Sequence, residues 1–272
     1  MSFRADGKRV KDADPMYTVA PYIMDKRYDA MNMITVDIPI DPIHNYINKK
    51  RAEGVRISHL AIIITAYLRI VEEFPMFNYF IVNKRIYKRN EFPVAMVVLK
   101  AGDSHESTMS KAYFELDDDI FQVNEKINSY IADNKKTENS NSTDKMIKWL
   151  LSVPGLVSFA VKVFKFLDRH GLLPKFIIDL SPFHSGLTIT NLASIRTNHI
   201  YHHIYEFGTT SVFISIGNSR EVPKRKNGEI IFEKCLPLGV VMDERICSGS
   251  YFATAFRKFR GYLANPEVLE KK

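Results

Sequence analysis

The stretch LPLGVVMDERICSGSYFATAFRKF (residues 236–259) decides how the rest of the chain is interpreted. Its first seven residues are apolar and predict a buried strand, and residues 250–266 predict an amphipathic helix that ends at Asn265-Pro266. A short polar turn connects the two, with Glu244 and Ser248 as its reactive side chains and no histidine. Enzymes often present a catalytic side chain in such a turn, so these two residues are the first candidates.

The surrounding sequence mixes strand and helix patterns without an internal repeat. Helices are predicted over 57–74, where Ser58 is a candidate N-cap, and over 119–134. Strands are predicted over 33–39, 187–190, 211–217, 228–232 and 236–242, with two more around a turn within 80–100. This mixture, without an interdomain linker, predicts one α/β domain over residues 1–272.

Two segments depart from this pattern. Residues 1–20 are polar and predict an irregular N-terminal arm or a peripheral strand. Residues 135–180 predict a polar loop, over 135–145, followed by an apolar insertion of two or three short helices with a break at Pro154-Gly155.

Composition argues against several classes of protein. The net charge is +7, but the 38 basic residues are scattered and accompany no nucleic-acid-binding motif, so nucleic acid is not expected as a partner. Two cysteines, Cys235 and Cys247, exclude a disulfide framework and fit a reducing compartment. The N-terminus lacks the apolar core of a signal peptide, and no apolar run is long enough for a transmembrane helix. We therefore expect a cytoplasmic protein.

Other motif-like residues carry less weight. Adjacent His202 and His203 would point to opposite faces of a strand, and no cluster at ligand spacing surrounds them, so no metal site is predicted. Cys247 has no partner histidine nearby in the sequence, which favours a buried core thiol over a nucleophile. The sequence contains neither the GxSxG motif of hydrolases nor a glycine-rich nucleotide-binding motif.

Three ordered segments carry a resemblance to a known family. HSGLTITNLASI (184–195), FGTTSVFISIG (207–217) and the opening stretch resemble the catalytic domain of the dihydrolipoamide acyltransferases of 2-oxo acid dehydrogenase complexes. EEFPMFN (72–78) and NPEVLE (265–270) are similar to further elements of that family. The resemblance implies the chloramphenicol acetyltransferase-like fold, a two-layer α/β sandwich whose mixed sheet is flanked by helices, with the apolar helical insertion as an addition.

The polar turn aligns with the family's DHRxxDG motif. Asp243, Arg245 and Gly249 match it, and the resemblance implies that they support the site. Glu244 replaces the histidine that serves as general base, and Ser248 replaces the aspartate that holds the geometry of the site.

The resemblance also implies a second half of the site. The family's oxyanion-stabilising hydroxyl falls on Thr190, beside Asn191 as a supporting residue. In the family, base and hydroxyl come from neighbouring subunits of a trimer, so a homotrimer is expected, with coenzyme A as substrate and no metal. No lipoyl-like domain is recognised upstream, so the acceptor is expected to be CoA or a free small molecule rather than a lipoyl group on this chain.

Replacement of the histidine changes the proton transfer. The pKa of a thiol lies roughly two units above that of histidine and roughly four units above that of an ordinary glutamate. Proton transfer from the thiol to glutamate therefore costs about 2.7 kcal/mol more than transfer to histidine. One hypothesis is an acyl-CoA-dependent acyltransferase that uses Glu244 or another base, for which His184, His202 and His203 are candidates. The alternative is a catalytically inactive trimeric binding or scaffold protein that keeps the fold.

Three roles are open for the apolar insertion at 146–180. We favour a helical hairpin packed on the trimer. The segment could instead line an enlarged pocket for a hydrophobic acyl chain. Trp149 and the cations Lys162, Lys165 and Arg169 also permit contact with a membrane surface.

Overall fold

A mixed sheet forms the centre of the computed structural model, which describes residues 3–99, 107–135, 149 and 151–271. Within these residues, seven strands have the order β10-β11-β9-β8-β6-β7, and β3 pairs with β11. They are β3 (Met31–Pro39), β6 (Phe92–Leu99), β7 (Ser107–Phe114), β8 (Leu187–Asn191), β9 (Val212–Ile216), β10 (Arg220–Lys226) and β11 (Glu229–Asp243). β8 runs parallel to β6 and β9, and the other pairings are antiparallel.

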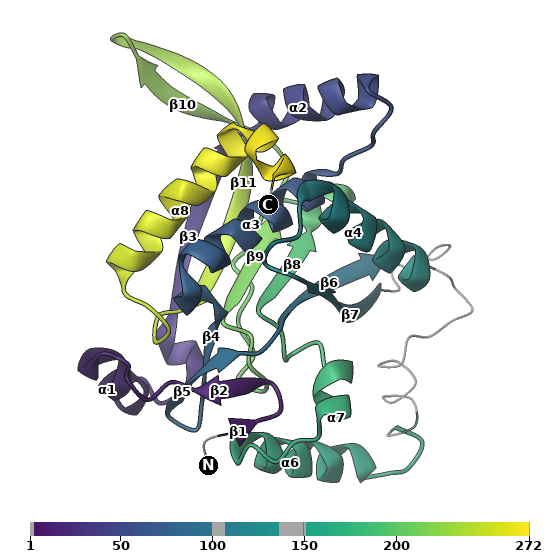
Figure 1. Ribbon diagram of the computed structural model, residues 1–272, viewed down its shortest axis with the longest axis vertical. Coiled ribbons are helices and arrows are strands. Elements are labelled where there is room, and N and C mark those ends of the chain that lie inside the picture. Colours follow the sequence, from purple (N-terminus) through teal and green to yellow (C-terminus); the bar gives the residue numbers. More distant parts are fainter. Residues whose placement is uncertain (1–2, 100–106, 136–148, 150, 272) are drawn as a thin grey trace.

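Helices cover one face of this sheet (Figure 1). α3 (His59–Glu73), α4 (Ile120–Lys135) and α8 (Gly249–Ala264) pack on it, and α2 (Ile40–Ala52) contacts α8 at one end. As predicted, Ser58 is the N-cap of α3, and its hydroxyl accepts from the backbone N–H of Ala61 at 3.1 Å. α3 is buried from Ala61 to Val71, because it lies between the sheet and both neighbouring helices. Sheet and helices together confirm the predicted fold class.

A smaller sheet lies beside the first, in the order β1-β2-β5-β4. Its strands are β1 (Phe3–Arg4), β2 (Gly7–Arg9), β4 (Tyr79–Val82) and β5 (Arg85–Arg89). Residues 80–100 therefore hold three strands rather than the predicted two, because Asn83 and Lys84 both adopt positive φ and close a tight hairpin. The N-terminal arm also contains α1 (Pro15–Ile23), which the sequence did not predict and which the Asp14 side chain caps.

The second correction concerns β11, which is one strand of 15 residues where two were predicted. Its first half pairs with β10 across the turn at 226–228, and its second half pairs with β3 and β9. Hydrogen bonding therefore continues through the polar residues that seemed to separate two strands. Short 3-10 helices complete the description: η1 (Arg27–Ala30), η2 (Pro75–Asn78), η3 (Leu192–Ile195) and η4 (Pro266–Glu270).

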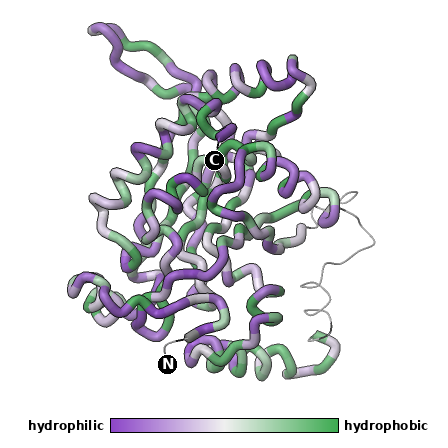
Figure 2. Tube along the Cα trace, viewed as in Figure 1, coloured by the Kyte–Doolittle hydropathy of each residue, from purple (hydrophilic) through white to green (hydrophobic). Residues whose placement is uncertain are grey.

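The predicted insertion forms α6 (Leu156–Arg169) and α7 (Lys175–Leu180), which lie at the end of the molecule that also holds β1 and β2 (Figure 1). Figure 2 shows hydrophobic residues along the central strands and again along α6. On α6, Phe159 is 66% and Phe166 58% exposed. The polar loop predicted at 135–145 lies outside the described residues from 136 onward. In the part of the chain that is described, no helix combines the length and apolar character needed to cross a membrane.

Candidate functional site

A buried carboxylate organises the turn that follows β11. Asp243 is fully buried, and Nε and Nη2 of Arg245 donate to its two oxygens at 2.8 and 2.7 Å. The guanidinium of Arg27 lies 3.4 Å from the same carboxylate. Burial disfavours the charge on Arg245, but hydrogen bonds to Asp243 and its negative charge outweigh burial and raise the pKa of Arg245. Charged contacts therefore hold the turn in one conformation.

Glu244 lies next to the ion pair of Asp243 and Arg245 and is half-buried. Its backbone N–H donates to the carbonyl of Ala30 at 2.9 Å, and Oε2 accepts a hydrogen bond from Asn32 Nδ2 at 2.6 Å. Asn32 stands opposite Met242 in the β3–β11 register, which brings its amide to the end of β11. Within the described residues Oε1 has no hydrogen-bond partner, so one oxygen is fixed and the other is free to accept a proton.

Ser248 and Gly249 begin α8. Ser248 is the N-cap, because its Oγ accepts from the backbone N–H of Tyr251 at 3.2 Å. Its own N–H donates to Tyr17 Oη at 3.0 Å. A Cβ on Gly249 would meet no atom within 4 Å, so packing within the chain does not require glycine there. Both residues are placed where the sequence predicted, at the start of the helix, and the Ser248 hydroxyl is engaged in capping.

Thr190 and Asn191 end β8, away from Glu244. Thr190 pairs with Ser215, which pairs with Gly239 on β11. Glu244 lies five residues beyond Gly239, or about 16 Å along the strand, and β8 is two strands away from β11. Within one chain the proposed base and hydroxyl therefore do not meet. Leu187 and Ile189 face the helix-covered core, so the Thr190 side chain points to the opposite face of the sheet.

The other candidate bases have structural contacts. His184 is buried, with Nδ1 2.8 Å from Ser181 Oγ and Nε2 3.3 Å from Asp168 Oδ1. His202 and His203 lie in an irregular segment, so the expected opposite orientation on a strand is wrong. Their ring centroids are 4.7 Å apart in a stacked arrangement.

Cys247 is a core thiol, as predicted. Its side chain is fully buried, and burial, together with the nearby charge of Asp243, raises its pKa to about 12. A thiol with this pKa stays protonated at neutral pH and is a poor nucleophile.

Residues 183–270 match the family model of the 2-oxoacid dehydrogenases acyltransferase (catalytic domain). This segment belongs to that acyltransferase family. It contains β8, β9, β11, the turn with Glu244 and α8, so it covers both halves of the predicted site. None of the curated proteins matches the sequence.

Solved acyltransferase structures share the fold of the whole chain. A probable dihydrolipoamide acetyltransferase from Listeria monocytogenes 4b F2365 has a TM-score of 0.59 at 13% identity, over 97% of both chains. The cubic core of the pyruvate dehydrogenase multienzyme complex gives 0.59 at 11% identity, over 96% of this chain and 94% of that one. A chloramphenicol acetyltransferase gives 0.57 at 10% identity, over 94% of this chain and 99% of that one. The acyltransferase segment therefore lies in a chloramphenicol acetyltransferase-like fold.

Two residues of the site were not predicted from the sequence. Arg27 reaches Asp243, and Asn32 reaches Glu244, each across more than two hundred residues of sequence. Only the pairing of β3 with the end of β11 could have pointed to Asn32.

Proposed function

We propose that the protein transfers an acyl group between a CoA thioester and a thiol or another small acceptor. The observation that carries the proposal is the carboxylate of Glu244, which takes the motif position of the catalytic histidine and is oriented by Asn32 with one oxygen free. Glu244 accepts the proton of the attacking thiol as its sulfur bonds to the thioester carbon, and the Thr190 hydroxyl donates to the oxyanion of the tetrahedral intermediate. Collapse of the intermediate breaks the C–S bond to CoA, and Glu244 returns the proton to the CoA thiolate. Asp243 and Arg245 keep the turn in place.

The separation of Thr190 from Glu244 supports a site shared between subunits. The face of the sheet that carries Thr190 is the one opposite α3, α4 and α8, so a neighbouring subunit can approach it. We propose a homotrimer in which one chain supplies the base and the next supplies the hydroxyl, with Asn191 exposed at the same edge. CoA is the substrate, and the chemistry requires no metal.

A scaffold function is the second candidate, and one observation favours it. Ser248 caps α8, and Asp243 is neutralised by Arg27 and Arg245, so these polar groups of the turn have structural roles. In this alternative the protein keeps the fold and the trimer and binds CoA without turnover. For either function we propose one domain over residues 1–272, in a reducing, cytoplasmic compartment, since Cys235 and Cys247 are both free and buried.

Acetyl-CoA with a panel of thiol acceptors tests the proposal. Glu244→Gln should lower turnover by at least about 100-fold, because the general base is lost, while light scattering shows an unchanged oligomer. Thr190→Val should lower the rate without changing the affinity for CoA. Glu229→Gln, an exposed position at the start of β11, is the matched control.

A restored motif separates the two functions. If Glu244→His/Ser248→Asp gains transfer activity that the wild type lacks, the scaffold function is correct. Wild-type turnover that survives Glu244→Gln unchanged would refute Glu244 as the base.

A further inference from the structure

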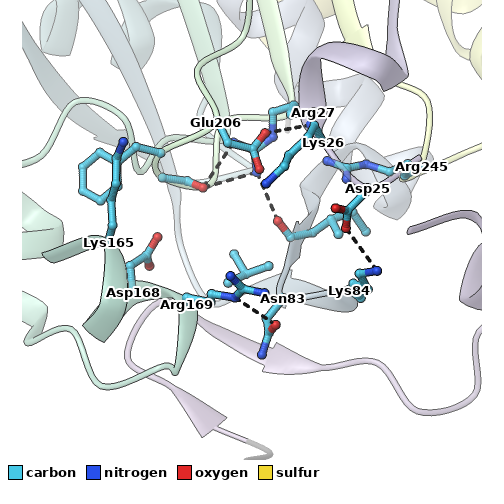
Figure 3. A pocket seen from close by; sticks show the side chains of 14 residues that line it. Asp25, Lys26, Arg27, Asn83, Lys84, Lys165, Asp168, Arg169, Glu206 and Arg245 are labelled. Atoms are coloured by element: carbon cyan, nitrogen blue, oxygen red, sulfur yellow. Dashed lines mark hydrogen bonds and ion pairs between the residues drawn. The ribbon is translucent and has the colours of Figure 1, made fainter. Parts of the chain in front are cut away.

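We propose that a cavity beside the acyltransferase turn binds a phosphoryl oxyanion. The cavity has a volume of about 300 Å³ and lies between α6, the β4–β5 turn and residues 25–27, with Arg245 in its wall (Figure 3). Its size suits a small ligand. α6 lies outside the segment that matches the acyltransferase family, so the insertion builds this site. The proposal does not depend on acyl transfer.

Positive charge dominates the lining. Six cations and three carboxylates surround the cavity, which leaves a surplus of positive charge. The cations are Lys26, Arg27, Lys84, Lys165, Arg169 and Arg245. A low-dielectric wall strengthens the attraction of such a group for an anion.

The three carboxylates have partners of their own. Asp25 pairs with Lys84 at 3.1 Å, and Asp168 pairs with Arg4 at 2.5 Å. Glu206 accepts the backbone N–H of Arg27 at 2.7 Å. Glu206 keeps its negative charge beside Arg27 and Arg245, but six cations against three carboxylates still leave a surplus of positive charge in the lining.

Two buried guanidiniums supply charge at the back of the cavity. Arg27 and Arg245 share the single carboxylate of Asp243. Arg27 Nη1 and Nη2 donate to the carbonyls of Tyr205, Gly208 and Ile81, so its hydrogen-bond donors are used. Burial lowers the pKa of Arg27 despite Asp243, and the nearby Arg245 adds to the effect. An anion in the cavity would relieve this excess of positive charge.

Three other side chains have donors to offer. The side-chain amines of Lys26 and Lys165 make no hydrogen bond or ion pair with the residues that the structure describes. Arg169 uses Nε for Asn83, at 3.3 Å, which leaves its Nη groups for a ligand. Lys165 and Arg169 lie one turn apart on α6, and Figure 3 shows them on the side of the cavity opposite Arg245.

The arrangement favours a phosphoryl group over a carboxylate. A phosphoryl group carries up to two negative charges and three acceptor oxygens, which match donors that approach from separate walls. The group can belong to a free phosphorylated compound or to a lipid headgroup, because exposed Phe159 and Phe166 lie on the same helix as Lys165.

Calorimetry with inorganic phosphate, at fixed ionic strength, tests the site on the full chain. Wild type should bind phosphate saturably, and Lys165→Gln/Arg169→Gln should bind at least about tenfold more weakly. Lys162→Gln is the matched control, since Lys162 is exposed on α6 outside the cavity, and its affinity should stay at the wild-type value. Lys26→Gln, on the opposite wall, should weaken phosphate binding as well. This single variant replaces the double variant in the test if the double variant fails to fold.

Sedimentation with vesicles distinguishes the two sources. Vesicles of phosphatidylcholine with phosphatidic acid should retain the wild type, in competition with inorganic phosphate, if the ligand is a headgroup. Phosphate binding without retention assigns the site to a free compound. The absence of saturable phosphate binding, or an equal loss in Lys162→Gln, would overturn the proposal.

Discussion

The helix-covered core and the α6–α7 insertion are held to the protein by different forces. Around α3 and α8 the contacts are apolar, with Phe259 and Leu68 fully buried. The insertion is attached largely through polar groups: Asp168 at the end of α6 contacts Arg4 and His184, and Lys111 donates to the carbonyls of Ile178 and His184. Many small apolar contacts stabilise the core, whereas a few charged contacts attach the insertion. The two regions should therefore respond differently to mutation and to pH.

The largest effect is expected in the core. Phe259→Ala removes a fully buried ring that lies 6.4 Å from that of Tyr67, and should lower the free energy of unfolding by about 4 kcal/mol. Denaturant titration measures this loss. Phe166→Ala, at an exposed position on α6, is the control and should change it by less than about 0.5 kcal/mol. Equal losses in the two variants would show that the insertion packs like the core.

Removal of Arg4 should act on the insertion and the adjoining small sheet, where Arg4 also pairs with Asp6, and not on the helix-covered core. Arg4→Ala leaves the buried Asp168 carboxylate without its guanidinium partner, which should cost about 3 kcal/mol. Hydrogen exchange should accelerate at the amides of α6 while those of α3 keep wild-type protection. Lys8→Ala, at an exposed neighbour, controls for charge. Uniform acceleration through the whole chain would contradict a separate attachment of the insertion.

Acid should weaken the same attachment before it affects the core. Burial opposes the charge of Asp168, but hydrogen bonding to His184 and the charge of Arg4 prevail and lower its pKa to about 2. Since the unfolded value is about 3.9, this carboxylate contributes about 2 kcal/mol above pH 4, which is lost as the pH falls towards 2. Hydrogen-exchange protection factors of the α6 amides measure the change, against those of the α3 amides for the core.

Asp168→Asn separates this effect from general acid unfolding. The variant should not lose α6 protection between pH 4 and 2, because it has no carboxylate to protonate. A loss of the same size in the variant would assign the change to other groups.

The contrast between the two regions also explains what the sequence could predict. β3, α3, β8, β9 and α8 have regular hydrophobic patterns, and each was predicted close to its position. α2 was missed although Ile40, Ile43 and Ile47 follow a helical period and are buried. β7 was missed because its sequence, rich in polar residues, shows no clear period. Arg4 and Asp168, 164 positions apart, meet only through tertiary structure, and no local pattern marks them.

In the candidate site, too, some residues could be predicted from the sequence and others could not. Glu244 and Ser248 were found because the motif is local, and their neighbours along the chain define it. The hydrogen bond from Asn32 depends on the β3–β11 register, and the cationic cavity depends on five segments that meet only in the folded chain.

The smallest effect concerns Ser248, which stands where the motif has an aspartate. Ser248→Ala removes the oxygen that accepts from the N–H of Tyr251 and should lower the free energy of unfolding by about 1 kcal/mol. Ser248→Asp keeps a capping oxygen and adds a negative charge at the positive end of α8, so it should retain or exceed wild-type stability. Thermal unfolding measures both variants. If Ser248→Ala is as stable as wild type but slower in acyl transfer, the hydroxyl acts in the reaction rather than as the cap of α8.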